Sequence, residues 1–160
     1  MPRGLIDRAR VTMDPRRFNA LFGGQWERMS GLVYDCYDEI ENQCDEFTLP
    51  TGTKYVGGID WGFTEPFVFK IRAITPQGGH FGVFEVYRSC LTIMDMINVV
   101  KRAQIVFDLG LVFCDPSQPG YIEEMGRHGI KAVPAVNDIR VGIDRHYELL
   151  KTRKLKYFRG

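Results

Sequence analysis

The sequence predicts an α/β fold with a mixed central sheet, and three observations lead to this prediction. Three strand-like segments follow one another between residues 54 and 88, joined by short turns. After them, helix-like and strand-like segments alternate to the end of the chain. Two of the apolar strand-like segments end in an aspartate, Asp60 and Asp115. A meander followed by alternating elements favours antiparallel strands extended by parallel ones, with helices on the faces.

The first third of the chain gives weaker signals. Residues 14–22 predict a helix, with Asp14 as the cap, Pro15 in the first turn and two glycines after the end. Residues 31–35 predict a short strand, and residues 38–45 are acidic and irregular. We therefore expect a linker-like segment over residues 1–53, with one short helix and one strand, ahead of a core over residues 54–160.

The meander is the clearest part of the pattern. Residues 54–61 and 66–75 are apolar and rich in β-branched and aromatic side chains, and residues 80–88 continue this pattern. The tetrapeptide PQGG at residues 76–79 is a strong hairpin signal between the second and third strands. Three antiparallel strands are expected here.

The second half predicts alternating helices and strands. Helical spacing covers residues 92–108, with Thr92 as a candidate cap, and a short strand follows at residues 111–114. Gly129 is suited to end a helix over residues 120–128. A strand at 131–136, a helix at 139–153 and a strand-like tail at 155–158 complete the series. The order β-β-β-α-β-α-β-α is the RNase H-like plan.

Asp60 and Asp115 are the candidate site residues. An aspartate after a buried strand is often only a turn former or a helix cap. In an α/β sheet, however, polar chemistry gathers beyond the carboxyl ends of strands. Two carboxylates on adjacent strand ends repel each other unless a cation lies between them or one is protonated. Oxygen ligands of this kind suit Mg²⁺ or Mn²⁺, so the pair predicts the start of a two-metal phosphoryl-transfer site.

Composition sets limits on other functions. The net charge is +1, so there is no overall basic field that would indicate nucleic acid. The segment KTRKLK at residues 151–156 is a local basic patch, or else part of an amphipathic edge strand. None of the four cysteines forms a CxxC pair, so zinc is not expected. The sequence shows neither a signal peptide nor a membrane span, which makes a cytoplasmic protein with reduced thiols the expectation.

Several segments, taken in order, resemble one family. FGGQW at 22–26 with GLVY at 31–34 is similar to a linker between an ATPase and a nuclease part. YVGGIDWGFTEP at 55–66 and CDPSQP at 114–119 are similar to two acidic strands. EVY at 85–87 and VGI at 141–143 are similar to a third strand and to the start of a later helix. Together they resemble the C-terminal nuclease domain of the large terminase subunits of tailed bacteriophages.

The resemblance implies a metal-dependent endonuclease that cuts concatemeric viral DNA during packaging, with Mg²⁺ or Mn²⁺ held by Asp60 and Asp115. It implies double-stranded DNA as substrate, an ATPase domain, a portal and a small terminase subunit as partners of the parent protein, and the host bacterial cytoplasm as location. Further metal-ligand candidates are Glu85, Asp138 and Asp144, although the favoured explanations are an exposed strand residue, a helix cap and a solvated side chain, respectively. The DNA-binding candidates are Lys151, Arg153, Lys154 and Lys156.

Two departures from the family pattern leave alternatives open. The chain has no G-x-x-x-x-G-K-[ST] motif, so it is not expected to run a packaging motor. The family's third acidic residue lies in a later helix, so we expect it to be absent and the chain to be a fragment. One alternative is a catalytically inactive RNase H-like module. Another is an actin-like or sugar-kinase ATPase, because GIDWGFT at 58–64 resembles a phosphate loop, but the second glycine-rich loop of those folds is missing.

Overall fold

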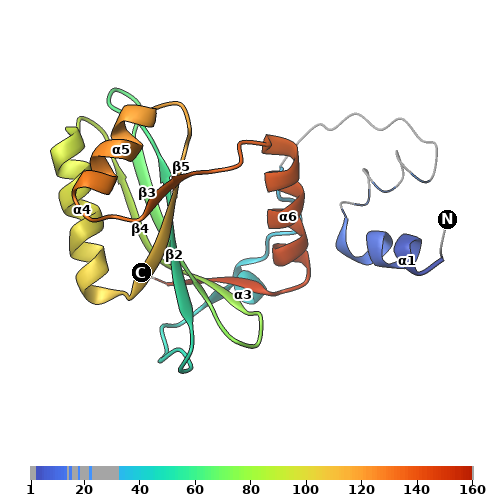
Figure 1. Ribbon diagram of the computed structural model, residues 1–160. Coiled ribbons are helices and arrows are strands. Elements are labelled where there is room, and N and C mark those ends of the chain that lie inside the picture. Colours follow the sequence, from blue (N-terminus) through green and yellow to red (C-terminus); the bar gives the residue numbers. More distant parts are fainter. Residues whose placement is uncertain (1–2, 14, 16–17, 19–21, 23–32, 160) are drawn as a thin grey trace. The chain divides into compact units, whose positions relative to one another are not determined.

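The computed structural model describes residues 3–13, 15, 18, 22 and 33–159 (Figure 1). The chain divides into two compact units, each described below by itself. One unit comprises Met1–Cys44 and Asp138–Lys156, and the other comprises Asp45–Asn137 and Tyr157–Gly160. The strands form one seven-stranded sheet in the order β1-β7-β4-β3-β2-β5-β6.

The larger unit contains the predicted meander. Strands β2 (Lys54–Asp60), β3 (Phe67–Ile74) and β4 (His80–Arg88) pair antiparallel in sequence order. The hairpin between β3 and β4 closes through hydrogen bonds between Thr75 and Gly79. These strands match the sequence-based boundaries to within one residue at each end, which confirms the antiparallel part of the predicted sheet.

Alternating helices and strands then extend the sheet in parallel. Helix α4 (Ile93–Val106) leads to β5 (Leu109–Cys114), which lies parallel to β2. Helix α5 (Pro119–Arg127) leads to β6 (Ala132–Pro134), which lies parallel to β5. The mixed sheet with flanking helices that the sequence predicts is therefore present.

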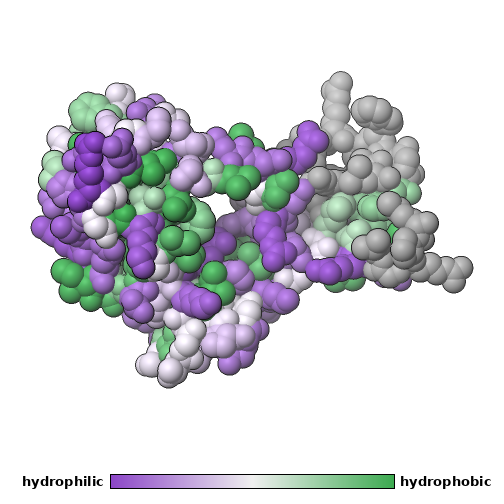
Figure 2. Space-filling view, viewed as in Figure 1, coloured by the Kyte–Doolittle hydropathy of each residue, from purple (hydrophilic) through white to green (hydrophobic). Residues whose placement is uncertain are grey.

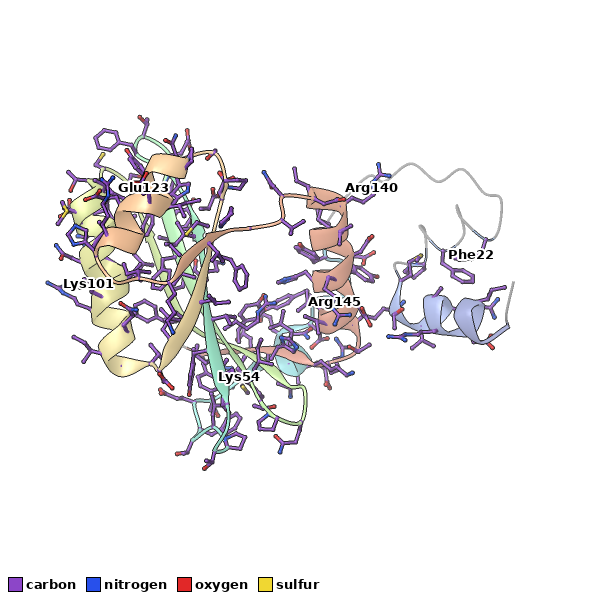
Figure 3. All side chains as sticks on the ribbon, in the orientation of Figure 1. Phe22, Lys54, Lys101, Glu123, Arg140 and Arg145 are labelled. Carbon is purple, nitrogen blue, oxygen red and sulfur yellow. The ribbon has the colours of Figure 1, made fainter. Side chains whose placement is uncertain are left out.

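The core of this unit lies between the sheet and helices α4 and α5, which cover the same face (Figure 1). Alternate β3 side chains point into it, and Phe67, Phe69 and Ile71 are almost wholly buried. Lys101 of α4 and Glu123 of α5 are exposed and point away from the sheet (Figure 3). On the surface, hydrophilic and hydrophobic residues are interspersed over the visible side (Figure 2).

The second unit contains α1 (Arg3–Thr12), α3 (Glu39–Asn42), β1 (Gln43–Cys44), α6 (Ile139–Lys151) and the start of β7 (Leu155–Phe158). Its polar centre is Asn42, which is fully buried. The Asn42 side-chain amide donates to the backbone oxygens of Leu150 and Leu155, both at 3.1 Å. This amide therefore joins the end of α6 to β7.

Two expectations for the first third of the chain need correction, and one helix was missed. Residues 33–36 form turns, whereas a strand was predicted over residues 31–35, of which 31 and 32 lie outside the described residues. The segment predicted to be irregular, residues 38–45, contains α3 and β1, because Asp38 caps α3 with hydrogen bonds to two backbone N–H groups. Helix α1 was not predicted. The predicted helix over residues 14–22 lies largely outside the described residues.

No helix in the described part of the chain has both the length and the apolar character that crossing a bilayer requires.

Candidate functional site

Asp60 and Asp115 lie at the ends of two neighbouring parallel strands. Asp60 is the last residue of β2, and Asp115 follows Cys114, the last residue of β5. The register pairs Ile59 with Cys114, and the backbone N–H of Asp115 donates to the Ile59 oxygen at 2.9 Å. The prediction that the two aspartates are on adjacent strands, at the same end of the sheet, is confirmed.

Strand alternation places the two aspartates on the same face of the sheet. Ile59 and Cys114 are buried in the core under α4 and α5. Because successive side chains of a strand point to opposite faces, Asp60 and Asp115 lie on the other face. Asp60 is exposed and Asp115 is half-buried. Both carboxylates are therefore accessible from solvent.

The chain leaves β2 and β5 in opposite directions along the sheet. After β2 it turns to β3 on one side, and after β5 it crosses through α5 to β6 on the other side. Connections that diverge from adjacent strands open a crevice at the carboxyl ends, which is where ligands of open α/β sheets bind. Asp60 and Asp115 lie at this position.

Two neighbouring side chains hold Asp115 in place. The Trp61 indole Nε1–H donates to the Asp115 backbone oxygen at 2.7 Å, which joins the two strand ends. The Ser117 hydroxyl donates to Asp115 Oδ2 at 2.6 Å, and the Ser117 backbone N–H reaches Oδ1 at 3.3 Å. Sequence reasoning did not assign a role to Ser117. The sequence DPS carries a local signal for this contact, because an aspartate carboxylate in a turn commonly accepts a hydrogen bond from the backbone N–H two residues later.

The chemistry of this donor set fits a hard divalent cation. Two carboxylates lie at adjacent strand ends, and such oxygen ligands suit Mg²⁺ or Mn²⁺. No group of three or more Asp, Glu, His or Cys side chains in the described residues has the arrangement of a metal site. Any ion held by Asp60 and Asp115 would therefore keep most of its waters, as Mg²⁺ commonly does.

The other acidic candidates are on other elements of the fold. Glu85 is on β4 and forms an ion pair with Lys70 of β3, with 3.2 Å between Nζ and Oε2. Lys70 is opposite Gly58 of β2, so strand β3 separates Glu85 from the strand that carries Asp60. Asp138 caps α6 by accepting from the Val141 N–H at 3.0 Å. Asp144 lies within α6, in the same unit as Asp138.

The basic candidates belong to the end of α6 and the start of β7. The Lys151 ammonium donates to the Met13 backbone oxygen at 2.6 Å. Arg153 has a positive φ of 59° and donates to the Cys36 oxygen at 3.3 Å. Lys154 is exposed and Lys156 is half-buried. The first two side chains thus have partners within their own unit.

Comparison with known proteins relates this geometry to solved structures. Neither a family model nor a curated protein sequence matches the chain. The large terminase of a thermophilic bacteriophage, solved in complex with ADP, matches over 99% of this chain with a TM-score of 0.87 and 20% identity. The chain spans 41% of the length of that protein.

Isolated nuclease domains match as well. The P22 large terminase nuclease domain matches with a TM-score of 0.69 and 15% identity, covering 81% of this chain and 73% of that domain. The large terminase nuclease of the thermophilic phage G20c, solved with bound magnesium, matches with a TM-score of 0.63 and 15% identity, covering 82% and 76%. The chain therefore shares the RNase H-like fold of large terminase nuclease domains.

Proposed function

We propose that this chain is a metal-dependent DNA endonuclease domain of the kind that cuts concatemeric viral DNA during phage packaging. The observation that carries the proposal is the pair Asp60 and Asp115, on one face and at the adjacent ends of parallel strands β2 and β5. The shared fold of the large terminase nuclease domains supports it. The pair would be the centre of phosphodiester hydrolysis.

Asp60 and Asp115 would hold Mg²⁺ or Mn²⁺. The G20c nuclease has been solved with magnesium and also with zinc. When bound, divalent ions activate a water nucleophile and stabilise the leaving oxygen of the scissile phosphate. Asp60 from the end of β2 and Asp115 from the end of β5 would hold the metal. Ser117 would keep the Asp115 carboxylate in one orientation by its short hydrogen bond.

Double-stranded DNA is the proposed substrate. Lys154 and Lys156 are the proposed contacts to its phosphates, because the other two basic candidates, Lys151 and Arg153, form hydrogen bonds within their own unit. An ATPase domain, a portal and a small terminase subunit are the proposed partners in a packaging assembly, in the cytoplasm of a bacterial host. Binding through lysines to phosphates would be independent of sequence and would weaken with salt.

A plasmid-nicking assay with Mn²⁺ tests the proposal. We expect slow cleavage, because two carboxylates supply about two negative charges for two ions that carry about four. Asp60→Asn and Asp115→Asn should each abolish it. Asp108→Asn is the matched control, since Asp108 is an exposed aspartate just before the opposite end of β5. Cleavage that survives both site substitutions, or that Asp108→Asn also abolishes, would overturn the assignment.

A catalytically inactive module with the same fold is the second candidate. The observation that favours it is the lack of a third acidic side chain beside Asp60 and Asp115 among the described residues. One result distinguishes the two candidates. If the wild-type chain binds Mn²⁺ through Asp60 but leaves the plasmid intact at every metal concentration, it is an inactive module.

A further inference from the structure

We propose that a cavity beside the carboxylate pair binds one unpaired nucleobase of a DNA strand. This inference rests on the proposed nuclease function. The cavity has a volume of about 550 Å³ and opens between the β2–β3 loop and the starts of α4 and α5. Cavities of this size are typical of sites for small organic groups.

The cavity and the carboxylates share the same two loops. Trp61 lines the cavity, follows Asp60 directly, and donates its indole N–H to the Asp115 backbone oxygen. Gln118 lines the cavity from the other loop, three residues after Asp115. Because side chains alternate across the sheet, Trp61 points toward the core face and Asp60 toward the opposite face. The cavity and the two aspartates thus lie at the same end of the sheet but on opposite faces, so the strand that carries a base in the cavity would have to cross this edge to reach the aspartates.

Aromatic rings form the walls. Trp61 and Tyr121 pack edge to face with their ring centroids 5.4 Å apart, and Trp61 also lies against buried Phe67 at 6.5 Å. Trp61 is thus supported from two sides, while Tyr121 remains 38% exposed and Phe63 62% exposed. Exposed aromatic faces are the surfaces on which unpaired bases stack, because every base has a π-face.

The loop that carries Phe63 is fixed before anything binds. A Cβ at Gly62 would lie 2.5 Å from the Pro66 backbone oxygen, so the tight turn requires glycine. The Cys90 backbone N–H donates to the Phe63 oxygen at 2.7 Å, which fastens the loop to the end of β4. A wall that is already ordered loses little entropy on binding, so more of the stacking energy remains as affinity.

The polar groups favour a neutral ring over an anion. Among the described residues, the cavity is lined by no Lys or Arg, and Glu65 is the charged residue in its lining. A phosphate or an acidic ligand would therefore be repelled. Gln118 occupies the N-cap position of α5, but its side chain does not cap the helix. Its amide has both a donor and an acceptor for the edge of a base.

The test uses the full chain, a single-stranded oligonucleotide that contains one 2-aminopurine, and a buffer with EDTA. Cleavage plays no part under these conditions, so a failed nuclease proposal would not affect the result. We expect the 2-aminopurine fluorescence to fall on binding, because stacking quenches it. Tyr121→Ala and Phe63→Ala should each weaken binding about 5- to 150-fold and remove the quenching. Tyr121→Phe should behave as wild type, since it keeps the ring.

Tyr37→Ala is the matched control, because Tyr37 is also 38% exposed but does not line the cavity. It should leave binding and quenching unchanged, and circular dichroism melting curves should show that every variant is folded. The proposal is overturned if the base binds without quenching, or if Tyr37→Ala has the same effect as Tyr121→Ala. It is also overturned if free 2-aminopurine nucleoside binds as tightly as the oligonucleotide, since the occupant would then not be part of a strand.

Discussion

Gly57 and Gly58 are adjacent in β2, but their Cα atoms face very different surroundings. A Cβ at Gly57 would lie 3.0 Å from a Phe69 ring atom and 3.2 Å from a Val112 methyl group, inside the core. A Cβ at Gly58, on the face that carries Asp60, would meet no atom of the described residues within 4 Å. At these two positions, β2 therefore lacks room for a Cβ on the core face and has room for one on the face that carries Asp60.

This contrast predicts opposite outcomes for two alanine substitutions. Gly57→Ala should lower the free energy of unfolding by about 1–3 kcal/mol, because it overpacks the core. Gly58→Ala should be neutral or stabilising by up to about 1 kcal/mol, because alanine restricts the unfolded chain more than glycine does. Urea unfolding of the two variants checks this. Equal destabilisation of both would show that β2 does not have this register.

The buried thiol of Cys114 gives a second prediction at this scale. Burial raises the pKa of Cys114 to about 11 from its ordinary value of 9.0. The folded state thus keeps the thiol protonated at a pH where the unfolded chain has begun to lose its proton. The resulting stability is complete below pH 9 and is lost as the pH rises toward 11. Cys114→Ala should therefore show a shallower loss of stability than wild type between pH 9 and pH 11.

Thiol labelling provides an independent check on the same residue. Cys90 is exposed, whereas Cys114 is buried. A thiol reagent at pH 8 should modify Cys90 rapidly and should reach Cys114 only after denaturant is added. Rapid labelling of Cys114 in the native protein would contradict its place under α4 and α5.

At the scale of elements, local signals and tertiary contacts each determine different parts of the chain. The strands of the meander follow their apolar pattern, and α4 begins where Thr92 predicts it, with Thr92 and Asp95 forming a reciprocal capping box. The segments α3 and β1 together span only Glu39–Cys44 and depend on contacts with residues more than a hundred positions away. Such short segments carry too few residues for a periodic signal, which is why the sequence predicted irregular structure there.

The same division applies to the candidate site. Asp60 and Asp115 could be predicted because each ends an apolar strand, a property of local sequence. Tyr121 could not be assigned a role, because its contact with Trp61 depends on the fold, whereas the contact of Ser117 with Asp115 is local and was overlooked. The pairing of Glu85 with Lys70 likewise follows from the register of β3 and β4, which the sequence did not specify.

Loss of the α4 cap has a defined expected cost. Thr92→Ala should lower the free energy of unfolding by about 1 kcal/mol, because the Asp95 backbone N–H loses its acceptor. Hydrogen bonds from Thr92 lower the pKa of Asp95, so their stabilising effect is present at neutral pH and is lost as the pH falls through that pKa. The difference in Tm between Thr92→Ala and wild type should therefore be larger at pH 7 than at pH 2. A difference that does not depend on pH would mean that Asp95 takes no part.

The buried amide of Asn42 should be more costly to remove. Asn42→Ala leaves the Leu150 and Leu155 backbone oxygens without this donor, and a buried polar group that loses its partner costs about 1–3 kcal/mol. Asn98→Ala is the matched control, since Asn98 is exposed on α4, and it should change stability by less than about 0.5 kcal/mol. Chemical denaturation of both variants decides whether Asn42 holds α6 and β7 together.

At the scale of the whole molecule, a cation between two like charges should couple metal binding to folding. Asp60 and Asp115 lie at adjacent strand ends of the folded sheet, whereas in the unfolded chain no strand pairing holds them close to each other. An ion that binds only the folded state stabilises it by RT ln(1 + [L]/Kd), which is about 1.4 kcal/mol at ten times Kd. For a chain of this length, that free energy corresponds to a rise in Tm of roughly 3–6 °C.

The metal-free and metal-bound states should respond to Asp60→Asn in opposite directions. Without metal, the substitution removes a repulsion between neighbouring carboxylates, so the Tm of Asp60→Asn should be equal to or slightly above that of wild type. With millimolar Mn²⁺, wild type should gain several degrees while Asp60→Asn gains little, so that the order of the two melting temperatures reverses. Asp108→Asn should gain as much as wild type, because Asp108 precedes the opposite end of β5. Melting curves of the three proteins with and without Mn²⁺ therefore test whether the two strand ends form one cation site, independently of whether the chain cuts DNA. If Mn²⁺ shifts all three Tm values equally, the ion binds elsewhere and Asp60 with Asp115 is not its site.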